Sequence, residues 1–245
     1  MRLSAFLGTA LEEITDLEHS KLLRTIMTLL LRPGALTTEY LSGRRKAFIG
    51  PVKIFLSVFA LSFLLYSVVK ATSIYDLNTL ASASPGNEIR SAISRLAQRT
   101  HLSESALIAE INARWQNYLT LTQAVYPLGI ALLYQLLYFR ARRYFAEHLI
   151  FALHFSSISL GLAILFWPIY VIAGVRLGPV YSVTTTLSLL VTLLWLTIAN
   201  RRVYGGSWWA SGIKAAVIEV GYFAIGLAIT LLTLWWATRG VGSAE

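Results

Sequence analysis

Residues 149–173 read LIFALHFSSISLGLAILFWPIYVIA, and this stretch decides the fold class. It contains no Asp, Glu, Lys or Arg, and His154 is its only imidazole. A helix that crosses a bilayer needs about 20 consecutive, mostly apolar residues, so the run is long enough. It is apolar on every side, whereas strands of a membrane barrel are about ten residues long and alternate in polarity. We therefore expect a membrane-spanning α-helix.

Other parts of the chain have the same character. The five expected spans are residues 52–69, 119–139, 149–173, 180–199 and 215–237. Of the 245 residues, 56% are hydrophobic and 13% are charged, while a soluble domain carries about 25% charged residues. This composition excludes a disordered chain, an ordinary cytosolic enzyme and a nucleic-acid-binding domain, despite the net charge of +9. The expected fold is an all-α integral membrane protein, a bundle of about five transmembrane helices.

The remaining segments predict helices outside the hydrocarbon core. Residues 1–51 are expected to form a cytoplasmic or interfacial amphipathic helical segment, and residues 52–245 the membrane bundle. Leu22, Ile26 and Leu30 recur at helical spacing, in a run too short to span a bilayer. The loop 70–118 predicts an extracytoplasmic helical hairpin whose second helix starts near Ser103.

The Lys and Arg residues are distributed unevenly. Two thirds of the 21 lie before the first span or in the loops after the second and fourth spans. Positive charge next to span ends favours the cytoplasmic side. We therefore expect a membrane protein with a cytoplasmic N-terminus and an extracytoplasmic C-terminus. The excess charge is also suited to anionic lipid.

Ionisable and amide side chains within the expected spans are the candidates for chemistry, because they are costly in hydrocarbon and often functional. Gln135, His154 and Glu219 are at similar expected depths, which predicts one polar layer and a His154–Glu219 pair. Glu147 and His148 precede His154 on the same expected helix. Ordinary packing and interface roles are the alternative. Common hydrolase, phosphate-loop and dinucleotide motifs are absent from the sequence, and so is Cys.

Several cations flank these positions and predict a basic cytoplasmic-side groove. Glu147, His148 and His154 would form its floor, and its rim would comprise Arg44, Arg45, Arg142, Arg143, Arg201, Arg202 and Tyr204. Such a rim suits an anionic head group, although positive-inside anchoring explains the arginines equally well.

Three blocks resemble an uncharacterised bacterial membrane family, domain-of-unknown-function family 3667. They are LLRPG at 30–34 with EYLSGRR at 39–45, RYFAEHLIFALHF at 143–155, and RRVYG at 201–205. The resemblance implies a polytopic inner-membrane protein without an established activity, in which Glu147, His148 and His154 are family features. Longer members begin with a Cys-rich segment resembling a zinc ribbon, which this sequence lacks.

The leading expectation is a non-enzymatic membrane protein that binds a lipid, a small anion or a protein partner at the groove. No cofactor is predicted. One alternative is an enzyme or electron carrier with a metal or haem held by His148 or His154. The other is a small transporter, which with five spans would act as an oligomer. Expected partners are the bilayer, anionic lipid and a further copy or another membrane protein, and not nucleic acid.

Overall fold

The computed structural model describes residues 20–68, 76–82, 86–141, 143–172, 179–239 and 241. Across these residues the secondary structure is helical, with turns between helices and no strand. Four helical segments are long and apolar enough to cross a membrane: Arg45–Leu65, Phe145–Phe166, Ser182–Tyr204 and Trp208–Arg239. These are the features of an integral, multi-pass membrane protein with an all-α fold.

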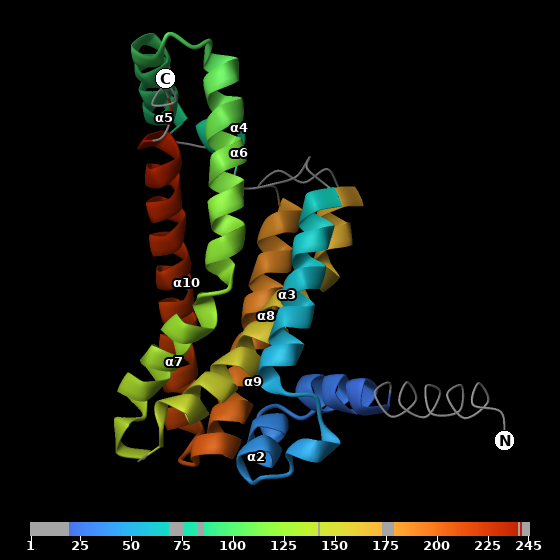
Figure 1. The fold of residues 1–245 in the computed structure, drawn as a ribbon. Coiled ribbons are helices and arrows are strands. Elements are labelled where there is room, and N and C mark those ends of the chain that lie inside the picture. Colours follow the sequence, from blue (N-terminus) through green and yellow to red (C-terminus); the bar gives the residue numbers. More distant parts are fainter. Residues whose placement is uncertain are drawn as a thin grey trace, which may run out of the picture.

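Four long helices of the described chain run along the bundle; three of them run in one direction and α9 runs in the opposite direction (Figure 1). They are α3 (Pro51–Val68), α8 (Phe145–Ile172), α9 (Pro179–Tyr204) and α10 (Trp208–Arg239). Figure 1 shows α3, α8 and α9 grouped together, with α10 beside α7 (Tyr126–Leu137) and α6 (Glu104–Gln123). Pro51 and Pro179 each open a helix, a position where the missing N–H costs no intrahelical bond.

The expected span 119–139 is not one continuous helix. It comprises the end of α6 and the whole of α7, with a break at Ala124 and Val125. Pro127 lies in the first turn of α7 and lacks a backbone donor, so an uninterrupted helix would lose a hydrogen bond there. The two helices together still run the length of the bundle (Figure 1).

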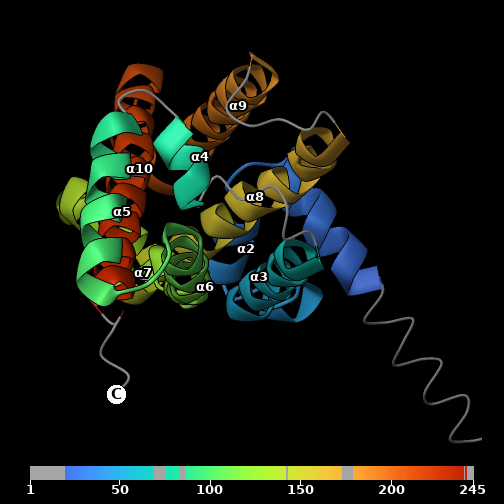
Figure 2. The ribbon, with the colours of Figure 1, turned by 90° about the horizontal axis from the view of Figure 1, so that it is seen from above.

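The polypeptide before α3 packs against one end of the bundle. Residues 20–31 are helical and lie across the bundle axis, as Figures 1 and 2 show together. The short helix α2 (Ala35–Leu41) follows the turn at Pro33-Gly34. We call this the basic end, because α9 ends there with Arg201 and Arg202 in its last turn, and Arg140 and Lys214 lie around the same hollow as Tyr204, the last residue of α9.

At the opposite end, α5 (Gly86–Thr100) and α6 are joined by a short turn. Ser103 caps α6, since its hydroxyl accepts a hydrogen bond from the Ala106 N–H. The expected helix therefore begins where the capping signal indicated. The short helix α4 (Leu77–Ser82) packs on the same pair.

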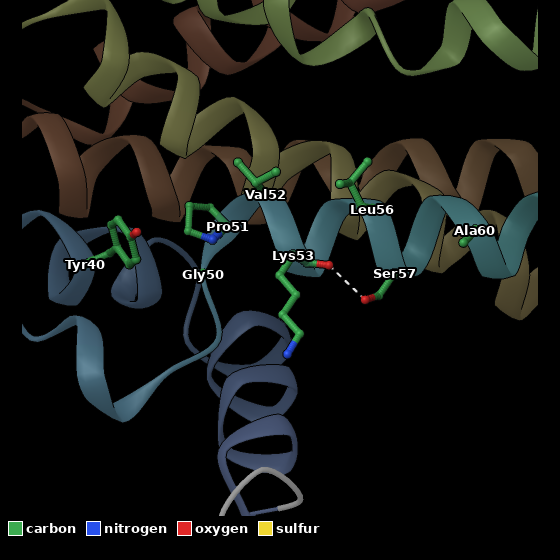
Figure 3. Close-up of a pocket in the computed structure, with 8 residues that line it drawn as sticks. All are labelled: Tyr40, Gly50, Pro51, Val52, Lys53, Leu56, Ser57 and Ala60. Carbon is green, nitrogen blue, oxygen red and sulfur yellow. Dashed lines mark hydrogen bonds between the residues drawn. The ribbon is translucent and has the colours of Figure 1, made fainter.

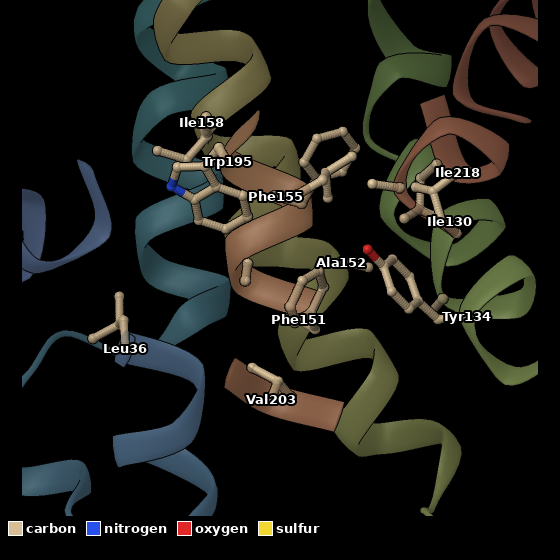
Figure 4. Packing of buried hydrophobic residues seen from close by; sticks show 14 of the residues in the cluster. Leu36, Ile130, Tyr134, Phe151, Ala152, Phe155, Ile158, Trp195, Val203 and Ile218 are labelled. Atoms are coloured by element: carbon tan, nitrogen blue, oxygen red, sulfur yellow. The ribbon is translucent and has the colours of Figure 1, made fainter. Parts of the chain in front are cut away.

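Two buried apolar clusters hold these parts together. The first is near the basic end and joins α2, α7, α8, α9 and α10 through residues such as Leu36, Tyr134, Phe151, Trp195 and Ile218 (Figure 4). The second lies at the opposite end, where Trp115 on α6 is fully buried and its indole donates to Thr233 Oγ1 on α10 at 3.2 Å. The polar side chains considered next surround the first cluster.

Candidate functional site at the basic end

A stack of aromatic rings lies at the basic end. Tyr138 and Tyr204 stack with ring centroids 4.0 Å apart, and the His148 ring lies 5.5 Å from that of Tyr204. His148 Nδ1 is 2.8 Å from the Tyr204 hydroxyl, although His148 is the fourth residue of α8 and Tyr204 is the last of α9. His148 is fully buried. The stack therefore fixes the ends of α7, α8 and α9 against one another.

Arg143, which precedes α8, contacts both the start of α8 and the end of α9. Its guanidinium donates to Glu147 Oε2 at 2.9 Å and to the Val203 carbonyl at 2.8 Å. It also lies over the Tyr204 ring, 5.3 Å from the centroid. Because it makes two hydrogen bonds and a cation–π contact within the protein, this arginine has a structural role. Of the predicted site residues, Arg143, Glu147, His148 and Tyr204 are brought together.

Three further polar contacts lie deeper in the first cluster. His154 Nδ1 is 2.8 Å from Thr37 Oγ1 of α2, and Tyr134 donates to Asn200 Oδ1 at 2.9 Å. The carboxylate of Glu219 accepts from Thr192 at 2.7 Å. His154 and Glu219 thus bond to separate threonines, and the expected His154–Glu219 pair does not form.

Several buried polar atoms have no hydrogen-bond partner among the described residues. They are His148 Nε2, His154 Nε2, Asn200 Nδ2, Glu219 Oε2, Tyr138 Oη and Ser156 Oγ. Buried polar atoms are ordinarily hydrogen-bonded to protein or water. Their concentration in this half of the bundle makes it the most polar interior of the described chain.

A cleft of about 600 Å³ opens beside the aromatic stack. We call it the basic-end cleft, and its lining includes Tyr138, Arg140, Tyr204, Ser211 and Lys214. The ammonium of Lys214 lies 3.8 Å from the centre of the Tyr138 ring, so it is held at the wall.

The turn between α9 and α10 completes the wall. Gly205 and Gly206, with φ of 74° and 96°, form this turn and also line the cleft. Positive φ favours glycine, so the two consecutive glycines explain how the chain turns tightly here.

The other predicted cations lie around this end but mostly contact the protein. Arg202 donates to the Pro33 carbonyl at 2.5 Å, and Arg44 pairs with Glu39. Arg45 lies over the Tyr40 ring, while Arg201 lies over Trp208.

Two of the predicted site residues remain. Gln135 is half-buried on α7, and Arg142 is outside the described residues. That all the predicted residues together form one basic groove stays a prediction.

A second hollow, apolar in character, runs along the outer surface of α3. Its volume is about 650 Å³, and its lining includes Tyr40, Pro51, Val52, Lys53 and Leu56. Figure 3 shows Tyr40 on α2 at one end and the α3 side chains along its length.

Sequence reasoning missed several members of the site. Tyr134, Tyr138 and Asn200 are central to it, and Asn200 carried a usable signal because an amide within an apolar span is costly. Thr37 and Thr192 carried no such signal, since threonine is common in these helices. In the part of the chain that the structure describes, no three His, Cys, Asp or Glu side chains are grouped so as to hold a metal ion.

Comparison with known proteins gives one match. Residues 19–63 match the model of a family described as "Protein of unknown function (DUF3667)". The match supports membership of that uncharacterised family and confirms the resemblance noted at residues 30–45. No curated protein and no solved structure matches the chain.

Proposed function

We propose that this integral membrane protein of an uncharacterised family binds the phosphate of an anionic lipid head group in the basic-end cleft. One observation carries the proposal: Arg140 and Lys214 line a cleft of about 600 Å³ whose other wall is the Tyr138–Tyr204 stack. Two cations beside aromatic rings offer a phosphate hydrogen-bond donors in a partly desolvated site. Neither cation is in an ion pair with a described carboxylate.

The residues around the cleft support a lipid rather than a free anion. Leu136 and Phe139, at the end of α7, are 70% and 66% exposed. Exposed apolar side chains of this size in a membrane protein are suited to acyl chains. A lipid could therefore place its phosphate between Arg140 and Lys214 and its chains along α7.

The proposal gives the predicted cations two different roles. Arg143 and Arg202 hold the site together through hydrogen bonds to Val203 and Pro33. Arg140 and Lys214 contact the ligand. Both groups belong to the positively charged side of the protein, which we place in the cytoplasm on the positive-inside rule.

The same placement makes the N-terminus cytoplasmic, with α6 and α7 as an interrupted fifth crossing and the C-terminus extracytoplasmic in a bacterial inner membrane. The helix at residues 20–31 would then lie in the interface. Leu23, Met27 and Leu31 are 56%, 54% and 69% exposed, and an exposed apolar face across the bundle axis suits that position.

Lipid binding to the purified protein tests the proposal. In nanodiscs of phosphatidylcholine doped with phosphatidylglycerol, the double variant Arg140→Gln/Lys214→Gln should bind the anionic lipid about tenfold more weakly than wild type, because two charge-assisted contacts are lost. The matched control is Lys46→Gln, an exposed cation at the same end that does not line the cleft. Equal retention of phosphatidylglycerol by wild type and the double variant would contradict the proposal.

A further inference from the structure

A second basic hollow lies at the opposite end of the molecule. Arg95 and Arg99 on α5 and Arg239 at the end of α10 line it together with Ala92, Leu96 and Thr238. Its volume is about 460 Å³. Two helices that are far apart in the sequence thus contribute three arginines to the lining of one hollow.

Among the described residues, no ion pair balances the charges of this hollow. The ion pairs between described residues join Arg44 to Glu39, Arg114 to Glu110 and Arg143 to Glu147, and none involves the three arginines. Glu104, at the start of α6, instead accepts a hydrogen bond from Ser94 at 2.5 Å. Arg95 and Arg99 are four residues apart on one helix, a spacing at which like charges repel.

The favourable interaction of cations with the C-terminal ends of helices accounts for part of this arrangement. Arg99 and Arg239 lie in the last turns of α5 and α10, where a cation is stabilised by the helix dipole. That role does not account for Arg95, which lies a turn earlier, nor for the convergence of all three on one hollow. Arg239 is also oriented, because its guanidinium lies 3.9 Å from the centre of the Trp235 ring.

We infer that this hollow, which we call the three-arginine pocket, binds a phosphate-type oxyanion. Guanidinium groups present paired N–H donors that match the oxygens of a phosphate monoester or diester. The anion would offset the repulsion between Arg95 and Arg99 and bridge α5 to α10.

Two sources of the anion are chemically equivalent here, a lipid head group and a soluble phosphate. The pocket lies within one turn of Trp235 and Trp236, and tryptophans favour the membrane interface. A lipid phosphate is therefore within reach, and the pocket is also open to the aqueous side through its exposed arginines.

The test uses two probes on the full chain in the Arg140→Gln/Lys214→Gln background, in which both ligand-binding cations of the basic-end cleft are removed. Inorganic phosphate is titrated into the detergent-solubilised protein by calorimetry, and retained phosphatidylglycerol is counted by native mass spectrometry after release from nanodiscs. Arg95→Gln/Arg99→Gln should weaken the binding of inorganic phosphate, of phosphatidylglycerol, or of both by about tenfold. Arg90→Gln, an exposed arginine of α5 outside the pocket, should leave binding unchanged.

The assay in which the double variant loses binding identifies the source of the anion. Loss of phosphatidylglycerol alone assigns a lipid, and loss of inorganic phosphate binding assigns a soluble anion. The inference is overturned if the double variant matches its parent in both assays, or if Arg90→Gln has an equal effect. Because the parent already lacks Arg140 and Lys214, failure here leaves the proposal for the basic-end cleft untouched.

Discussion

At Gly34, the polypeptide just before α2 packs directly against the backbone of α9. The φ of Gly34 is 75°, and a Cβ built there would lie 2.9 Å from both Cα and O of Ala199 on α9. An alanine would therefore meet fixed backbone as well as an unfavourable left-handed conformation. We predict that Gly34→Ala destabilises the protein by more than the roughly 1–3 kcal/mol expected for the backbone conformation alone.

Gly43 supplies the matched control for that prediction. It has a φ of 89°, but a Cβ there would have no neighbour within 4 Å. Gly43→Ala thus carries the conformational cost without the collision. Melting temperatures in detergent should fall further for Gly34→Ala than for Gly43→Ala, and equal shifts would show that α2 does not dock on α9 in this way.

Thr37 tests the polar contact of a fully buried histidine. Replacing Thr37 by Val keeps the shape of the side chain and leaves His154 Nδ1 without its partner. We predict a loss of about 1–3 kcal/mol, the cost of an unsatisfied buried polar group. Thr38→Val is the control, because Thr38 is exposed and bonds only to the Gly34 carbonyl one turn away. If both variants melt alike, the His154 contact does not contribute to stability.

At the residue scale, the sequence alone identified only one of the two residues in each of the buried contacts made by His154 and Glu219. His154 and Glu219 could be identified because charged or imidazole groups at membrane depth need a reason to be there. Their partners Thr37 and Thr192 could not, since the pairing depends on how α2 and α9 approach α8 and α10. Matched depth alone was misleading, because helices can share a level and present their side chains to different neighbours.

At the scale of elements, hydrogen bonds join the helix at residues 20–31 to the rest of the molecule. The indole of Trp195 donates to the Leu29 carbonyl at 3.0 Å, and the Ile49 N–H donates to Thr25 Oγ1 at 3.0 Å. We predict that Trp195→Phe, which removes the first hydrogen bond, makes the amides of residues 22–31 exchange with deuterium about fivefold faster.

Trp208→Phe is the corresponding control, because Trp208 is 55% exposed and contacts Arg201 rather than this helix. Exchange in residues 22–31 should not change in this variant. Unchanged exchange in Trp195→Phe as well would mean that the helix is held by other contacts.

Element boundaries were predictable where a local signal exists. Ser103 marks the start of α6 through its own hydrogen bond, and Pro33-Gly34 separates the first helix from α2. The break at Ala124 and Val125 was harder, because the hydrophobic run continues through it and only Pro127 interrupts the pattern. Hydropathy reports the length of an apolar stretch and not whether one helix or two fill it.

At the scale of the whole molecule, the all-α membrane fold followed from the length and composition of the apolar runs. The packing of α6 and α7 against α10 did not, since it rests on side chains such as Trp115 and Thr233 that meet only in three dimensions. The basic-end cleft was missed for the same reason: Arg140 and Lys214 are far apart in the sequence and come together through the α9–α10 turn.

The topology is open to a direct test because the sequence has no native Cys. Single variants Ser42→Cys, Ser103→Cys and Ser207→Cys can each be labelled in cells with a membrane-impermeant maleimide. We predict periplasmic labelling at position 103 only, because α3 and the α6–α7 pair would each cross the membrane. Labelling of position 207 from outside the cell, or protection of position 103, would contradict the five crossings.

The most direct test of the central claim is where an anionic lipid attaches. A photoreactive phosphatidylglycerol with its crosslinker on the head group should label peptides containing residues 137–141 and 204–214, and a phosphatidylcholine analogue should label them far less. The same peptides should lose the label in Arg140→Gln/Lys214→Gln. Equal labelling by the two lipids, or crosslinks that avoid these two segments, would contradict the assignment of the basic-end cleft as an anionic-lipid site.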